Sequence, residues 1–275
     1  MFSQPYLVTN FSLLLGREEY DRTEQLEMKI IIVLPAFNAE RTLLRTLAEI
    51  PPEYAKYIIL VDDASKDKTV EVAQKAGLTV FRHEKNRGYG GSQKTCYTKA
   101  LAMGADVAVM LHPDHQYDAK VIPQMVKPII DDETDAVFGS RMLGGCPREG
   151  GMPWWKYIAN IFLTALANVV FGRYLTEIHS GFRAYSRKYL ETVRFLDNSD
   201  DFVFDTEIIA QGMACKFFFR EIPIVTRYFP EASSINLRRS IVYGFGILWV
   251  LLKYLLHSRG IIHFNQFEPR KNAND

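Results

Sequence analysis

Five short apolar runs, each closed by a polar loop, constrain the fold of this chain more than any other feature. The runs cover residues 29–34, 57–61, 78–81, 107–111 and 136–138. Segments with apolar residues at helical spacing lie between them, at residues 43–50, 70–76 and 121–130, and a further helix is expected after residue 91. Buried strands that alternate with helices are typical of a mostly parallel sheet. We therefore predict an α/β, Rossmann-like fold with helices flanking the sheet.

Polar side chains gather where these runs end. In sheets of this kind, the loops after the strands converge on one ligand. The loop after residues 107–111 is the richest, because His112, Asp114 and Gln116 supply nitrogen and oxygen atoms within five residues. Oxygen ligands suit Mg²⁺ and Mn²⁺, and an imidazole suits Mn²⁺ better than Mg²⁺. We predict a divalent metal at Asp114 and Gln116, and leave open whether His112 joins them or only hydrogen-bonds a neighbouring loop.

Composition excludes several classes of protein. The net charge of +1 creates no basic field, so nucleic acid is not expected as a partner. Three cysteines, Cys96, Cys146 and Cys215, are far apart and lack CxxC spacing, which indicates neither a disulfide framework nor a zinc site. The apolar patch at residues 11–15 has no basic region before it and acidic residues after it, unlike a secretory signal. We expect a cytoplasmic protein.

Six motifs between residues 29 and 235 occur in an order that resembles the inverting glycosyltransferases of family 2. These enzymes have the GT-A fold. The resemblance is greatest to the polyprenyl-phosphate glycosyltransferases, typified by dolichol-phosphate mannose synthase. The motifs are Pro35-Ala-Phe37-Asn38, Val61-Asp-Asp63-x-Ser65-x-Asp67-x-Thr69, Asn86-x-Gly88-x-Gly90, Asp114 with Gln116, Gly139-Ser-Arg141 and Ser180-Gly-Phe182-Arg183.

The resemblance assigns roles to residues at the predicted strand ends. Pro35 and Phe37 match residues that line the nucleotide pocket of similar enzymes, and Asp63 matches one that hydrogen-bonds the base or ribose. Asp114 matches a nucleotide-site residue that holds the cation on the donor's diphosphate. The residues themselves leave another role open, because Asp62 and Asp63 also suit capping of the next helix.

Three arginines match phosphate-binding positions. Arg141 and Arg183 correspond to arginines that position a phosphate, and Arg227 corresponds to a basic residue near the donor phosphate or is a solvated loop residue. A lysine usually follows the Arg227 loop, but Asn236 stands there. The glycines of residues 86–91 would let the backbone approach the ligand, or form an ordinary tight turn.

The acceptor decides whether the reaction needs a general base. A polyprenyl phosphate is already anionic and needs none, whereas a hydroxyl of a saccharide or protein needs a carboxylate. Asp205 and Glu207 are the candidate bases in that second case, and their alternative role is to complement a helix dipole.

The metal motif departs from the family. The usual Asp-x-Asp is His112-Pro-Asp114 here, so one carboxylate is missing. An enzyme that uses Mg²⁺ or Mn²⁺ remains the leading prediction. The loss of the carboxylate makes a non-catalytic nucleotide-sugar-binding protein the alternative from another class.

Two apolar segments, residues 158–171 and 241–256, bear on membrane contact. The second spans about 24 Å as a helix, short of the roughly 30 Å hydrocarbon core. Arg238 and Arg239 precede it, and Trp249 and Tyr254 favour interfaces, which suits a helix in the headgroup plane at the cytoplasmic face of a membrane. The alternative is a buried or dimer-forming helix in a homo-oligomer.

These observations divide the chain into four predicted parts. Residues 1–28 form an N-terminal extension, and residues 29–145 bind the nucleotide-sugar. Residues 146–235 shape the acceptor side of the GT-A domain. Residues 236–275 form an apolar and basic C-terminal helical tail.

Overall fold

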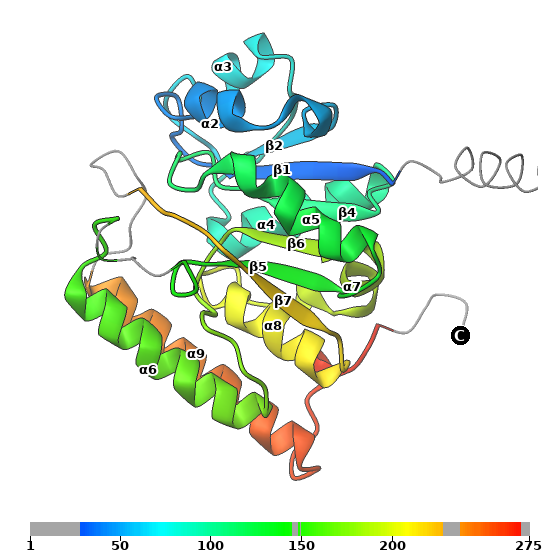
Figure 1. Cartoon of the computed structure of the whole chain (residues 1–275), viewed down its shortest axis with the longest axis vertical. Coiled ribbons are helices and arrows are strands. Elements are labelled where there is room, and N and C mark those ends of the chain that lie inside the picture. Colours follow the sequence, from blue (N-terminus) through cyan, green and yellow to red (C-terminus); the bar gives the residue numbers. More distant parts are fainter. Residues whose placement is uncertain (1–27, 145–147, 149, 228–236, 271–275) are drawn as a thin grey trace, which may run out of the picture.

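A seven-stranded mixed sheet forms the centre of the molecule in a computed structural model, which describes residues 28–144, 148, 150–227 and 237–270 (Figure 1). Residues 1–27 of the predicted extension, Cys146 and Asn236 lie outside the described residues, as does the side chain of Arg238. The strand order is β3-β2-β1-β4-β6-β5-β7. The strands are β1 (Ile30–Ala36), β2 (Ile58–Asp62), β3 (Thr79–Arg82), β4 (Val107–Met110), β5 (Ala136–Ser140), β6 (Arg183–Ser186) and β7 (Phe219–Pro223).

Strand β6 alone runs antiparallel to its neighbours, β4 and β5, and every other pairing in this sheet is parallel. The prediction of a mostly parallel sheet is therefore confirmed. All five apolar runs form strands within one or two residues of the predicted bounds. The chain crosses from β5 through a long helix to β6, which places the start of β6 beside the end of β4.

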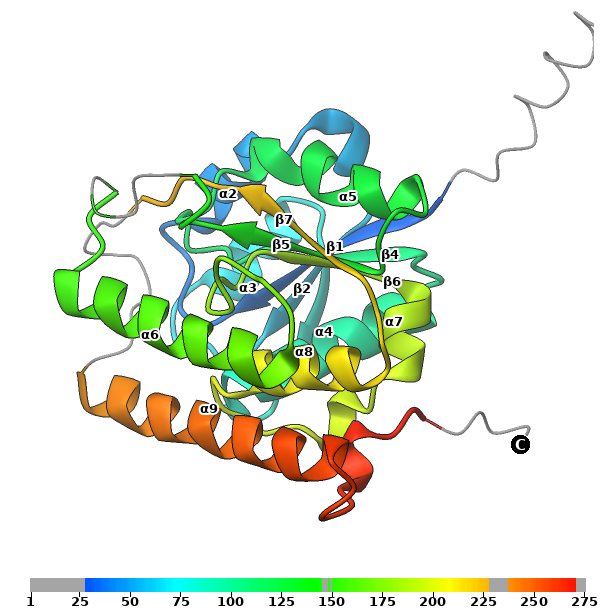
Figure 2. The same ribbon diagram turned by 60° about the horizontal axis from the view of Figure 1, so that its bottom comes forward.

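Helices cover both faces of the sheet because neighbouring strand residues point to opposite sides. In β1, Ile31 and Val33 pack toward one helical layer, and Ile32 and Leu34 pack toward the other. Figure 2 shows the sheet between the two layers. One layer holds α2 (Leu43–Glu49), α3 (Thr69–Lys75) and α5 (Ile122–Ile130); the other holds α4 (Gly88–Ala102), α6 (Trp154–Phe171), α7 (Arg187–Thr192), α8 (Phe204–Ala214) and α9 (Leu237–Ser258).

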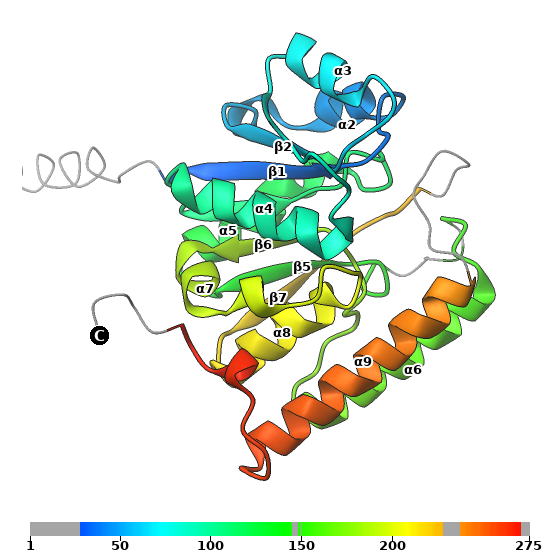
Figure 3. The same ribbon diagram turned by 180° about the vertical axis from the view of Figure 1, so that it is seen from behind.

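Helices α6 and α9 lie side by side and project beyond the sheet (Figures 1 and 3). Val250 and Leu251 are buried on the inner side of α9, and the ring of Tyr254 packs edge-on against Phe171 at 4.9 Å. Tyr254 therefore belongs to the core and not to an interfacial belt.

The length argument from the sequence was wrong, because α9 has 22 residues and spans about 33 Å. By length and composition alone, its residues Arg239–Ser258 could cross a membrane. The helix is nevertheless packed against α6 and α8 along one side.

Candidate active site

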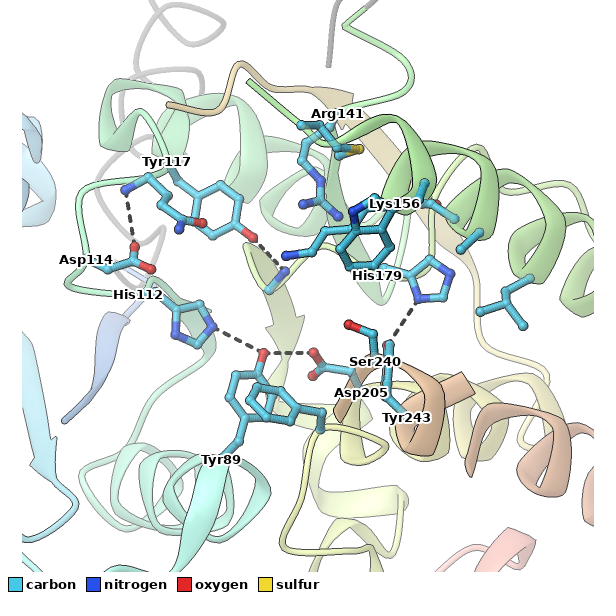
Figure 4. A pocket seen from close by; sticks show the side chains of 18 residues that line it. Tyr89, His112, Asp114, Tyr117, Arg141, Lys156, His179, Asp205, Ser240 and Tyr243 are labelled. Carbon is cyan, nitrogen blue, oxygen red and sulfur yellow. Dashed lines mark hydrogen bonds between the residues drawn. The ribbon is translucent and has the colours of Figure 1, made fainter. Parts of the chain in front are cut away.

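A cavity of about 220 Å³ lies at the sheet edge where β4 and β5 end and β6 begins. Helices α6 and α9 form its outer wall, and Figure 4 shows the side chains that surround it. Its polar lining includes His112, Asp114, Gln116, Arg141, Lys156 and Asp205, and its apolar lining includes Met152, Trp155, Ala159 and Leu163.

The loop after β4 brings the predicted metal ligands together. His115 adopts a left-handed backbone conformation, with φ of 59°, which an L-residue adopts at a cost. This bend lets the Asp114 carboxylate accept the Gln116 backbone N–H at 3.1 Å. His112, Asp114 and Gln116 all line the cavity. Nitrogen and oxygen donors of these types suit a divalent ion such as Mg²⁺ or Mn²⁺. Burial lowers the pKa of His112, and the charges of Asp114 and Asp205 oppose that change.

Asp205 faces the cavity from the first turn of α8. Its carboxylate accepts hydrogen bonds from the Tyr89 hydroxyl at 2.8 Å and the Gln93 amide at 3.0 Å, and Arg183 lies 3.6 Å away. Glu207 points elsewhere and accepts the Ser199 backbone N–H at 2.6 Å. Of the two candidate bases, the structure brings only Asp205 to the cavity.

Arg183 lies beneath the cavity and does not line it. Its guanidinium donates to the backbone carbonyls of Ser180 at 2.7 Å, Ile178 at 2.9 Å and Asp205 at 3.0 Å. Only 1 % of the residue is exposed. These contacts fix the start of β6 against the start of α8 and leave no nitrogen open to the cavity for a phosphate.

Two cations line the opposite side of the cavity. Arg141 donates from its backbone N–H and guanidinium to Glu177, a carboxylate that is 1 % exposed and also accepts from Asn160. Lys156 comes from α6, and burial followed by the charge of Arg141 lowers its pKa. No carboxylate within the described ranges pairs with Lys156. Glu177 offsets the charge of Arg141, so Lys156 supplies the positive charge that suits this part of the cavity to an anion.

His179 completes this wall. Its Nδ1 lies 3.1 Å from the Tyr243 hydroxyl, whereas Nε2 is buried and has no hydrogen-bond partner among the residues that the structure covers. Burial lowers the pKa of His179 to about 4, against the raising effect of Glu177. The ring is therefore neutral at pH 7.

The residues expected to bind the nucleotide lie at the ends of β1 and β2, outside this cavity. Phe37 is 51 % exposed, and Pro35 is partly buried in β1. The Asp63 carboxylate accepts the backbone N–H groups of Arg87 at 2.7 Å and Gly88 at 3.0 Å, and lies 2.7 Å from His83 Nδ1. Asp63 thus braces the glycine-rich segment and does not cap α3.

The glycine-rich segment is not an ordinary tight turn, because its three glycines lie in the first turn of helix α4, which begins at Gly88. A Cβ on Gly90 would lie 2.3 Å from the Ser199 carbonyl oxygen, so the glycine is required for contact with the segment before α8. Arg227, at the far side of the Asp114 loop, is paired with Glu49 at 2.8 Å and is not solvated alone.

Several polar cavity residues were not assigned a role in the sequence analysis. Tyr89 was within a quoted motif but had no role assigned, although its position between two glycines was visible. The others come from helices or loops whose packing is not local in sequence. They are Lys156, Asn160, His179 and Tyr243.

A second group, His257, His263 and Glu268, lies at the end of α9 with ligand atoms within 4.8 Å of one another. His257 Nδ1 accepts the Phe264 backbone N–H at 3.2 Å, so a neutral His257 carries its proton on Nε2. The nitrogen nearest Glu268 is Nε2, at 3.7 Å, and it is therefore not a free ligand. This group does not fit a metal.

Comparisons with known proteins identify relatives of this chain. Residues 31–194 match the domain described as glycosyl transferase family 2. An uncharacterized protein of Methanocaldococcus jannaschii is 33 % identical over 224 residues, which are 82 % of this chain and 91 % of that protein. A UDP-N-acetylglucosamine–dolichyl-phosphate N-acetylglucosaminyltransferase of Methanococcus voltae is 28 % identical over 241 residues. These residues cover 81 % of this chain and 94 % of that protein.

The fold is also found among solved structures. Glucosyl-3-phosphoglycerate synthase from Mycobacterium tuberculosis, crystallised with Mn²⁺, UDP and glucosyl-3-phosphoglycerate, superposes with a TM-score of 0.63 at 18 % identity. The match covers 93 % of this chain and 86 % of that one. The predicted GT-A architecture is confirmed.

Proposed function

Because the chain belongs to glycosyl transferase family 2, we propose that it transfers a sugar, with inversion, from a nucleotide-diphosphate donor to a polyprenyl phosphate. The observation that carries this proposal is the cavity wall made by Arg141 and Lys156, two cations beside an apolar lining from α6. A phosphate attached to an apolar chain needs cations for its charge and an apolar lining for its chain. The name of the Methanococcus voltae relative supports the same class of acceptor.

The surroundings of Asp205 favour an acceptor that needs no general base. A hydroxyl acceptor would have to give its proton to this carboxylate. Both oxygens of Asp205 already accept hydrogen bonds from protein groups, and the buried Arg183 stands beside them. An acceptor phosphate is already a nucleophile, and its position is then set by Arg141 and Lys156.

The proposed donor site lies along the same edge of the sheet, where β1 and β2 end. Exposed Phe37, with Pro35, is available to the base, and Asp63 fixes the backbone beside it. Asp114 and Gln116 would hold Mg²⁺ or Mn²⁺ where the donor diphosphate meets the cavity. Bound there, the ion would neutralise the charge that develops on the leaving diphosphate. Arg227, which is held by Glu49 beside the Asp114 loop, would attract the donor phosphates.

We place the protein at the cytoplasmic face of a membrane through α6 and α9. Large apolar side chains are exposed along both helices, with Phe162 64 % and Phe245 68 % exposed. Such a face suits the boundary between headgroups and acyl chains. The remaining exposed apolar residues of this face are Trp154, Ile158, Ile161, Val169, Ile241, Val242, Leu248, Trp249 and Leu252.

Two successive measurements test the proposed function. Calorimetric titration with a panel of nucleotide-diphosphate sugars, with Mn²⁺, Mg²⁺ or chelator, should show metal-dependent binding of one donor that Asp114→Ala abolishes. Transfer assays should then show activity toward a polyprenyl phosphate and not toward the corresponding polyprenol or a free saccharide.

Lys156→Ala tests the acceptor site. Removing this cation should raise the KM for polyprenyl phosphate roughly 10-fold or more, since a charged hydrogen bond contributes about 1.5–3 kcal/mol. The Kd of the donor should not change. Lys127→Ala, which removes an exposed lysine from α5, is the matched control and should alter neither constant. Equal loss of donor and acceptor affinity in Lys156→Ala would contradict the assignment.

A further inference from the structure

Tyr89 connects the two sides of the site. Its hydroxyl oxygen lies 2.8 Å from Asp205 Oδ2 and 3.3 Å from His112 Nε2, and its ring stacks on His112 with 15° between the planes. Figure 4 shows His112 between Asp114 and Tyr89. A phenol has one proton to donate, so the two contacts cannot both be donations from Tyr89.

The proton of Tyr89 goes to Asp205. The carboxylate lies next to the guanidinium of Arg183 and already accepts from Gln93, so it serves as the acceptor for the phenol proton. The shorter distance agrees with a charge-assisted bond. The Tyr89 oxygen can then only accept from His112, and this requires the His112 proton to be on Nε2.

Backbone packing holds the ring in this orientation. A Cβ on Gly181 would lie 2.5 Å from His112 Nε2 and 3.1 Å from the Tyr89 hydroxyl oxygen, so the two groups fit together only because residue 181 has no side chain. Gly181 is itself anchored, because its backbone N–H donates to the Tyr117 hydroxyl at 3.0 Å.

In this tautomer the other ring nitrogen of His112, Nδ1, carries a lone pair and no proton. His112 Nδ1 has no hydrogen-bond partner within the described part of the chain, and it is not sealed in the protein interior. His112 lines the cavity together with Asp114 and Gln116. A neutral imidazole with a free Nδ1 is a ligand that Mn²⁺ accepts more readily than Mg²⁺ does.

We infer that Tyr89 and Asp205 fix the tautomer of His112 so that Nδ1 replaces the missing carboxylate as a metal ligand and gives the site a preference for Mn²⁺ over Mg²⁺. The inference rests on the proposed function for its metal-bound donor. Tyr89 is a positioning residue that acts through His112. A hydrogen bond to the far nitrogen of a metal-binding histidine commonly sets its orientation and affinity.

The tautomer is measured first, on the metal-free full chain labelled with [¹⁵N]histidine. Long-range ¹H–¹⁵N spectra distinguish protonated from unprotonated ring nitrogens, and His112→Gln identifies the resonance. We expect Nε2 protonated in the wild type and a mixture of tautomers in Tyr89→Phe. Tyr243→Phe removes a hydroxyl bonded to His179 in the same cavity and should leave the His112 signals unchanged. An Nδ1-protonated His112 in the wild type would overturn the inference.

Metal ligation is measured by electron spin echo modulation with Mn²⁺ alone and with Mn²⁺ and UDP. Nitrogen modulation from an imidazole should be present in the wild type and in His179→Gln, and lost in His112→Gln. In Tyr89→Phe, Mn²⁺ binding should weaken roughly 10-fold. Mg²⁺ binding should weaken less, so the ratio of the two affinities should fall.

Modulation that persists in His112→Gln, or an unchanged Mn²⁺ to Mg²⁺ ratio in Tyr89→Phe, would refute the assignment. Failure of the proposed function has a different signature, namely no binding of any nucleotide-diphosphate sugar and no transfer. The tautomer in the metal-free protein and the modulation with Mn²⁺ alone are measurable in either case.

Discussion

The Arg183 guanidinium holds two backbone segments together beneath the cavity. It donates to carbonyl groups before β6 and at the start of α8, and it neutralises Asp205. A buried ion pair of this kind is costly to break, because the remaining charge has no water to stabilise it. The residue therefore acts on the site through the position of Asp205.

Arg183→Met should lower the free energy of unfolding by about 3–5 kcal/mol, because it leaves the Asp205 carboxylate unpaired. Arg187→Met is the control, since Arg187 forms an exposed pair with Glu191 and should cost less than about 1 kcal/mol. Urea unfolding measures both. A fully stable Arg183→Met protein with a raised acceptor KM would instead indicate direct phosphate contact.

His179 should make stability depend on pH. Burial lowers its pKa to about 4 in the folded state, compared with about 6.5 in the unfolded chain. The unfolded state therefore takes up the proton first. The stabilising contribution is complete above pH 6.5 and is lost between about pH 6.5 and 4, with a total on the order of 3 kcal/mol.

Urea unfolding of the wild type and His179→Gln from pH 7.5 to 4.5 checks this expectation. The wild type should lose stability more steeply than the variant over this range, because only the wild type has the histidine to protonate. Parallel curves would show that His179 does not contribute.

At the scale of elements, α9 has two different sides. Its inner side carries Ile247, Val250 and Leu251, and Lys253 also turns inward, toward Glu207 at 3.5 Å and the Gln266 side-chain oxygen at 2.6 Å. The lysine that interrupts the apolar run thus faces protein.

Phe245→Ser should weaken binding to lipid vesicles roughly 30-fold, because burial of one phenylalanine contributes about 2 kcal/mol. The thermal midpoint should hardly change, since the side chain is 68 % exposed. Phe218→Ser is the matched control: Phe218 is 63 % exposed but lies next to β7, away from α6 and α9. Vesicle co-sedimentation distinguishes the two variants, and equal losses would contradict the docking face.

Elements could be predicted from the sequence where they are uniformly apolar. Strand β4 is buried along its whole length, as its apolar sequence of valines, alanine and methionine predicts. Strand β6 was not predicted, because Arg183 and Ser186 at its ends are polar although Arg183 is buried. Strand β7 has no fully buried residue and contains Arg220 and Glu221, so it also lacked an apolar run.

At the scale of the whole molecule, the site is assembled from both halves of the chain. His112 and Asp114 follow β4, Tyr89 and Asp205 lie in the first turns of α4 and α8, and Lys156 comes from α6. The sequence pointed to Asp114, Gln116, Arg141 and Asp205 because strand ends and family motifs identify them. It could not identify Lys156 or Tyr243, whose places in the site depend on how α6 and α9 pack against each other.

The position of β5 in the sheet has a consequence for synthesis of the protein on the ribosome. Its two neighbours, β6 and β7, both come later in the chain, so β5 has nothing to pair with when it emerges. Every residue of Ala136–Ser140 is buried in the finished protein. A nascent chain that stops before β6 therefore presents an apolar strand with two open edges, which promotes association between chains. Until β6 and β7 have been made, the growing polypeptide depends on chaperones or on rapid elongation to stay soluble.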